Sequence, residues 1–138
     1  MSVLNRVAYF QDRRDEVPNQ ELARELAARR DLQGIQEIAE NLRHEKPSIQ
    51  SDCLKVLCEV GYLAPELIAD YAGRFLRLLE SKNNRMVWVT TIALATIAGL
   101  RPREIWAHAD DLIYAVERGS LITVVWGLRA LAKVHSST

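Results

Sequence analysis

Apolar residues recur along this chain at a fixed interval. Leu57, Leu94 and Leu131 follow one another every 37 residues. The same interval separates the members of four further sets: Val60, Ile97 and Val134; Leu42, Leu79 and Val116; Ile38, Phe75 and Leu112; and Pro65 with Pro102. A fixed period of this kind is typical of stacked helical repeats, in which each unit buries its apolar side against the next.

Within each period, the apolar residues follow helical spacing and are bounded by capping and breaking residues. We expect helices over residues 19–30, 32–44, 49–60, 65–79, 85–98, 102–118 and 121–134. Asn19 and Ser120 are the expected caps of the first and last helices, and Gly61 is the expected end of the third.

This pattern predicts an all-α fold of about seven helices. Paired along the chain, the helices would form an α-solenoid of about three helix pairs, with residues 19–30 as an N-terminal capping helix. We expect residues 19–134 to be a single domain, residues 1–18 an N-terminal arm and residues 135–138 a frayed tail.

Residues 65–99 resemble a HEAT repeat, of the HEAT and armadillo group of helical repeats. They combine a first helix that starts at a proline and ends in a leucine pair, an asparagine turn, and a second helix that opens with arginine. The matching residues are Pro65, Leu78, Leu79, Asn83, Asn84, Arg85, Ala93, Leu94 and Ile97. The next repeat keeps Pro102, Ala130, Leu131 and Val134, but has Gly119 and Ser120 at the turn and Ile122 in place of the arginine. The chain is thus similar to small bacterial HEAT-like proteins, a resemblance that implies a fold and no activity.

In HEAT-like arrays the second helices usually line the side that binds partners, so the resemblance implies a binding surface on the outward side of these helices. The candidate binding residues are Asp52, Lys55, Arg85, Trp88, Val89, Ile92, Trp126 and Arg129. Tryptophan and arginine are enriched among the residues that dominate binding energy in protein interfaces.

The aromatic and basic candidates also have structural explanations. Trp88 and Trp126 are large enough to wedge between neighbouring helices as part of the core. The resemblance also implies that Arg85 pairs with an acidic or asparagine side chain in a neighbouring turn. Trp106 is expected to pack beneath the loop at Gly99.

The charge of the chain constrains the kind of partner. Its 138 residues include 18 Lys and Arg and 18 Asp and Glu, so the formal net charge is zero. Nucleic-acid binding normally needs a basic excess to displace counterions from phosphate. We therefore expect a protein or peptide partner, and the low net charge also permits a homo-oligomer.

Catalytic and metal-binding patterns are missing from the sequence. Asp110 and Asp111 are adjacent on a helix, so their side chains diverge by about 100° and cannot converge on one substrate. The three histidines lie in separate segments, without the spacing of a helical metal site. We expect no metal, no cofactor and no enzymatic activity.

The cysteines and the apolar stretches indicate the compartment. Cys53 and Cys58 lie on one expected helix with side chains in different directions, which predicts buried, reduced thiols. No apolar stretch approaches the ~20 residues that span a bilayer, and the N-terminus lacks the apolar core of a signal peptide. The sequence predicts a cytoplasmic protein without membrane contacts.

These features together predict a non-catalytic protein- or peptide-interaction module, a scaffold or adaptor, that binds through the second-helix surface. The alternative is a nucleic-acid-binding helical-repeat protein. It follows from a resemblance to HEAT-like DNA glycosylases, some of which read DNA with Trp, Arg and Asp side chains on a concave surface.

Overall fold

The computed structural model describes residues 2–118 and 121–137, with the backbone alone described for residues 121–124 and 137. Every regular element in these ranges is helical: eight α-helices and five 3-10 helices, with no strand. The predicted all-α class is therefore confirmed. None of the described helices has both the length and the apolar composition needed to cross a membrane. The chain consists of two compact units, Met1–Ile68 and Ala69–Thr138.

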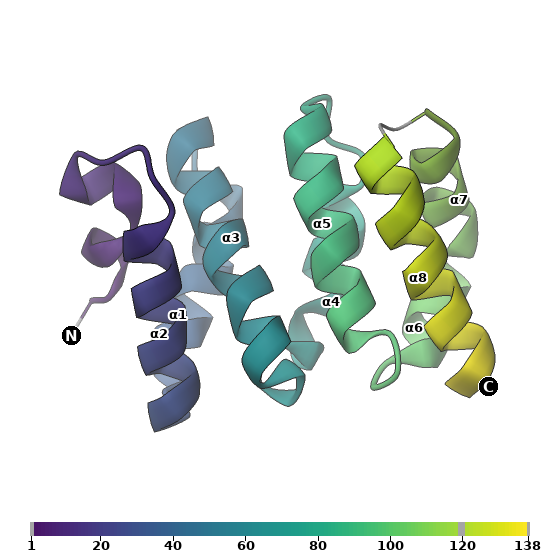
Figure 1. The fold of residues 1–138 in the computed structure, drawn as a ribbon, viewed down its shortest axis with the longest axis horizontal. Helices are drawn as coiled ribbons and strands as arrows, with labels where there is room; N and C mark the ends of the chain where they lie inside the picture. Colours follow the sequence, from purple (N-terminus) through teal and green to yellow (C-terminus); the bar gives the residue numbers. More distant parts are fainter. Residues whose placement is uncertain (1, 119–120, 138) are drawn as a thin grey trace. The chain divides into compact units, whose positions relative to one another are not determined.

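The first unit is built around its longest helix, α3. Its α-helices are α1 (Val17–Arg29), α2 (Leu32–Glu40) and α3 (Pro47–Leu63). Four 3-10 helices complete it: η1 (Leu4–Arg6), η2 (Ala8–Gln11), η3 (Asn41–Arg43) and η4 (Pro65–Leu67). Both α1 and α2 pack against α3, and the N-terminal segment, purple in Figure 1, contacts α1 and α3 through η2.

Two helix ends in the first unit differ from the prediction. Asn19, the predicted cap, lies inside α1, which begins at Val17, and its side chain is 1% exposed. The helix α3 continues past Gly61, the predicted end, to Leu63. Glycine ends a helix when it adopts a left-handed conformation, and no described glycine has a positive φ.

The second unit contains two parallel helices, α5 (Asn84–Ile97) and α8 (Leu121–Ser137), that lie side by side in Figure 1. Its other elements are η5 (Ala69–Tyr71), α4 (Ala72–Leu78), α6 (Pro102–Ala107) and α7 (Ala109–Arg118). The helix α5 also packs against α4, and α8 also packs against α6 and α7. Asn83 caps α5 as the asparagine turn predicts, because its Oδ1 accepts hydrogen bonds from the N–H groups of Arg85 (3.0 Å) and Met86 (3.4 Å).

Three predictions about helices after Ala64 are wrong: two expected helices are divided, and the last helix is longer than expected. The expected 65–79 helix is divided into η4, η5 and α4, since the N–H groups of Leu67 and Ile68 bond to carbonyls only three residues back. The expected 102–118 helix is interrupted at His108, between α6 and α7. Residues 135–137 form the last turn of α8 instead of a frayed tail. The predicted turn and cap residues Gly119 and Ser120 lie outside the described residues.

The 37-residue interval marks core positions in each unit. In the first unit these are Ile38, Leu42, Leu57 and Val60; in the second they are Phe75, Leu79, Leu94, Ile97, Leu112 and Val134, all buried. Val116 and Leu131 are half-buried. A Cβ atom on Gly127 would lie 2.2 Å from Val116 Cγ2, so glycine is what permits α7 and α8 to approach this closely. The arrangement of the units as one solenoid stays a prediction.

Both cysteines are free and buried in α3, as the sequence predicts. Burial raises the pKa of each thiol from its usual 9.0 to about 12. Nearby carboxylates add to this shift in pKa: Asp52 and Glu37 act on Cys53, and Glu59 and Glu16 act on Cys58. The nucleophilic thiolate is therefore disfavoured at both positions.

Leu94→Ala should lower the free energy of unfolding by about 2–5 kcal/mol, because it removes a fully buried side chain and leaves a cavity. The matched control is Leu128→Ala in α8, where the side chain is 54% exposed. It should change the free energy of unfolding by less than about 0.5 kcal/mol. Denaturant unfolding followed by circular dichroism measures both, and equal losses would contradict the assignment of Leu94 to the core.

The thiols should be unreactive toward a disulfide reagent in the native state near pH 8 and fully reactive in denaturant. Because the folded-state pKa is raised, the neutral thiols favour folding below about pH 9, and this contribution to stability is lost as pH rises toward 12. Melting temperatures should therefore fall less over this range in a Cys53→Ala/Cys58→Ala variant than in wild type. Rapid labelling of both native thiols would contradict their burial.

Candidate functional site

Asp52, a predicted binding residue on α3, fastens the N-terminal segment within the first unit. One of its carboxylate oxygens accepts a hydrogen bond from Tyr9 N–H (2.8 Å), and the other accepts one from the side-chain amide of Asn19 (3.0 Å). Asn19 Oδ1 in turn accepts a hydrogen bond from Ala8 N–H (2.9 Å). Both oxygens of Asp52 are thus already engaged inside the unit.

Lys55, one turn further along α3, also serves an internal contact. Its Nζ lies 3.1 Å from Glu16 Oε1, and its side chain is only 16% exposed. On the next turn, burial together with repulsion from Glu16 raises the pKa of Glu59. The predicted surface of the first unit is therefore engaged by the segment that precedes α1.

The other six predicted residues lie on α5 and α8 of the second unit. The Asn83 cap places Arg85 in the first turn of α5, where it is exposed. Trp88 and Ile92, on the following turns, are half-buried. Val89 is buried, contrary to the outward position expected for it, because it belongs to the side of α5 that forms the core.

On α8, an arginine and a tryptophan form a preassembled pair. The Arg129 guanidinium carbon lies 4.6 Å from the centre of the Trp126 ring, within cation–π distance. Trp126 is half-buried and Arg129 is exposed. One turn further along, Lys133 Nζ donates a hydrogen bond to the Ala95 carbonyl oxygen at 2.7 Å, which ties α8 to α5.

The sequence leaves open whether Trp88 and Trp126 are part of a binding surface or pack between neighbouring helices, and their positions combine both features. Each side chain is partly packed against its surroundings and partly open to solvent. The α5–α8 surface, defined here as Arg85, Trp88, Ile92, Trp126, Arg129 and Lys133, thus presents aromatic and aliphatic area beside three cations.

A further exposed aromatic group lies on α6 and α7, where the sequence analysis expected packing. Trp106 is 62% exposed and Tyr114 is 61% exposed, so the expectation that Trp106 packs beneath the loop at Gly99 is wrong. The Arg118 guanidinium carbon lies 4.8 Å from the centre of the Tyr114 ring, and Arg118 also donates a hydrogen bond to the Leu79 carbonyl oxygen (2.6 Å). Helical spacing along the sequence does not relate Trp106 to Tyr114, because the helix is interrupted at His108 between them.

The titratable groups of α7 form no enclosed site. His108 Nδ1 lies 3.3 Å from Asp111 Oδ2, and both side chains are about half exposed. Asp110 is exposed as well. Among the described residues there is no group of three side chains that could hold a metal ion.

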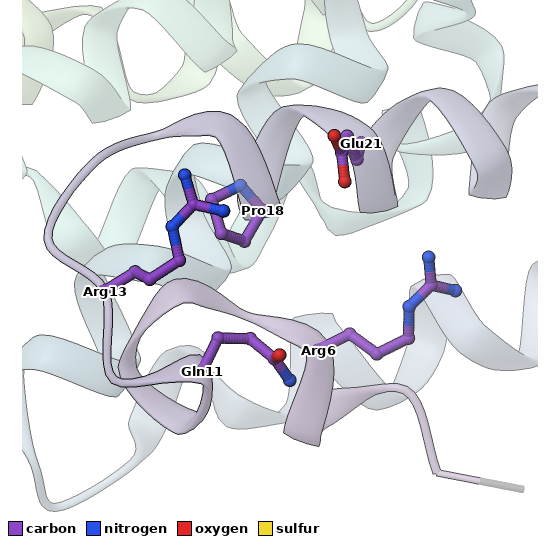
Figure 2. Close-up of a pocket in the computed structure, with 5 residues that line it drawn as sticks. All are labelled: Arg6, Gln11, Arg13, Pro18 and Glu21. Carbon is purple, nitrogen blue, oxygen red and sulfur yellow. The ribbon is translucent and has the colours of Figure 1, made fainter.

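A hollow of about 160 Å³ lies beside the N-terminal end of α1, between Arg6, Gln11, Arg13, Pro18 and Glu21 (Figure 2). Both of its cations are already neutralised. Arg6 Nη2 lies 2.6 Å from Glu25, which lowers the pKa of that carboxyl, and Arg13 forms a two-point contact with Asp15 (2.8 and 2.9 Å). Anion binding there would have to displace these carboxylates.

Comparisons with known proteins extend the description of the fold. No family model matches the chain, and no curated protein sequence matches it. One solved structure, an engineered protein from the Northeast Structural Genomics Consortium, aligns with 99% of this chain at 20% identity and a TM-score of 0.71. This chain spans 64% of the length of that structure. At this level of identity, the likeness establishes a shared all-helical fold.

Proposed function

We propose that this protein is a non-catalytic protein- or peptide-interaction module that binds its partner through the α5–α8 surface. The observation that carries the proposal is that two packed helices present half-buried Trp88, Ile92 and Trp126 together with exposed Arg85 and Arg129. Rigid helices hold these side chains in place before binding, which lowers the entropic cost of forming an interface. Tryptophan and arginine are also the residues most enriched at interface centres.

The chemistry of the described side chains supports a binding role over catalysis. Both thiols are buried and disfavoured as thiolates, so neither is an activated nucleophile. The α5–α8 surface contains no carboxylate that could serve as a general base.

The surface that we propose is smaller than the one that the sequence predicts. Asp52 and Lys55 hold the N-terminal segment of the first unit, so we assign the binding role to the second unit. The same bonds weaken the analogy with DNA glycosylases, because Asp52 was the carboxylate on which that analogy depended.

Nucleic-acid binding is the second candidate, because the α5–α8 surface joins three cations with two tryptophans. Its distinguishing property would be a steep loss of affinity with salt, since each phosphate contact releases counterions.

A Trp88→Ala/Arg129→Glu variant should lose the partner, because it removes an aromatic contact and reverses a charge on the proposed surface. Immobilised wild type and variant would be used to capture partners from nuclease-treated lysate of the source cell. The matched control is Trp106→Ala/Arg103→Glu, which changes the same residue types at exposed positions on α6. Proteins retained by wild type and by the control, but lost by the variant, would support the proposal.

Circular dichroism melting must show that each variant is folded. Because Trp88 is half-buried, Arg85→Glu/Arg129→Glu is the second variant, with both changes at exposed positions. A partner retained equally by all variants would overturn the assignment to α5 and α8. A partner captured by wild type from untreated lysate, but not from nuclease-treated lysate, would favour nucleic acid.

A further inference from the structure

We infer that the partner of the α5–α8 surface is an acidic protein segment, in which carboxylate side chains flank a bulky apolar residue. This inference rests on the proposed function and specifies the chemical class of the partner.

The charges of the second unit are segregated by helix. The sequences of α5 and α8 contain no Asp or Glu, yet they carry Arg85, Arg129 and Lys133. The acidic residues that follow α5 are instead on α6 and α7: Glu104, Asp110, Asp111 and Glu117. Since the whole chain is neutral, the positive α5–α8 surface reflects the distribution of charges and not their total.

These cations have no carboxylate partner in the part of the chain that the structure describes. Among the described side chains, no Asp or Glu oxygen lies within 4.0 Å of the side-chain nitrogens of Arg85, Arg129 or Lys133. Elsewhere in the same unit, Arg101 pairs with Asp70 at 2.7 Å. The α5–α8 surface therefore offers positive charge that a partner can neutralise.

The hydrogen-bonding capacity of the cations is also largely unused. The Arg129 guanidinium lies over the Trp126 ring at cation–π distance, a contact that uses none of its N–H donors. An arginine can offer two parallel N–H groups to one carboxylate. Lys133 uses one of its three donors on the Ala95 carbonyl oxygen, so two remain.

The order of residues along the helices defines the pattern that a partner must match. The bond from Lys133 Nζ to the Ala95 carbonyl oxygen brings the cation of Lys133 to the level of Ala95 on α5. Trp88 lies about two turns before Ala95 on α5, and Trp126 lies about two turns before Lys133 on α8. Arg85 lies about one turn before Trp88, toward the N-terminus of α5. The cations therefore lie on both sides of the tryptophans along the helix axes. From Arg85 to the level of Ala95 and the Lys133 cation, the distance along α5 is about 15 Å.

An extended segment of about five residues covers this length. Carboxylates at its two ends would reach Arg85 on one side and Arg129 with Lys133 on the other, and an apolar side chain between them would contact Trp88, Ile92 and Trp126. A polynucleotide would also satisfy the cations, but three cations are few for phosphate binding.

The test uses the indole N–H signals of the three tryptophans in heteronuclear NMR spectra of the full chain, assigned with single Trp→Phe variants. The first probe is the capped peptide Glu-Glu-Leu-Phe-Glu-Glu. The second is the same peptide with every glutamate replaced by glutamine, and the third is a short oligothymidylate. Trp106, on α6, is the internal control.

We expect the acidic peptide to shift the Trp88 and Trp126 signals and to leave the Trp106 signal in place. The glutamine peptide should bind at least about tenfold more weakly, because it cannot form charge-assisted hydrogen bonds. Arg85→Glu/Arg129→Glu should weaken binding of the acidic peptide by at least about tenfold, while the control Arg103→Glu should not.

Three outcomes would overturn the inference. Equal binding of the two peptides, with shifts at Trp88 and Trp126, would refute the acidic class and leave the interaction surface intact. No shift with either peptide would refute the inference, and the capture experiment would then decide the proposed function separately. Tighter binding of oligothymidylate than of the acidic peptide, at the same two tryptophans, would refute both in favour of nucleic acid.

Discussion

Burial of apolar side chains between short helices is the constraint on which both units depend. Helices as short as α2, α4 and α6 are not stable alone in water, so each forms only by covering its apolar side with a neighbour. The consequence is greatest for α5, which packs against both α4 and α8 and has Leu94 and Ile97 fully buried. Because this core holds α5 against α4 and α8, it also fixes the positions of the backbone that carries the α5–α8 surface.

The tryptophans show how one helix serves two purposes. Val89 and Leu94 commit one side of α5 to the interior, and this leaves Trp88 and Ile92 at the boundary with solvent. Thr91, which is buried, donates its hydroxyl hydrogen to the Trp88 carbonyl oxygen (2.6 Å), so a polar group next to this surface is satisfied without water. Binding residues and core residues are thus alternate positions of the same helical turns.

Charged side chains are engaged differently in the first unit and on α5 and α8 of the second. In the first unit, several charged groups are engaged locally: Asp52 accepts hydrogen bonds from Tyr9 and Asn19, Lys55 is paired with Glu16, and Arg6 is paired with Glu25. On α5 and α8, no carboxylate is available in the sequence of either helix. A surface that keeps its cations unneutralised retains electrostatic attraction for a partner, and that attraction favours rapid and specific association.

The sequence by itself determined the all-α class, the buried positions at 37-residue intervals, the Asn83 cap and the buried thiols, because these follow from local spacing and hydrophobicity. It misplaced Asn19 as a cap, ended α3 at Gly61 and predicted that Trp106, which is exposed, packs beneath the loop at Gly99. The sequence also left Asp52 and Lys55 without partners, because the groups that bind them, Tyr9 and Glu16, are distant in sequence. Only the tertiary structure decided which residues of a helical face are covered, since long-range packing and hydrogen bonds select among faces that local periodicity leaves equivalent.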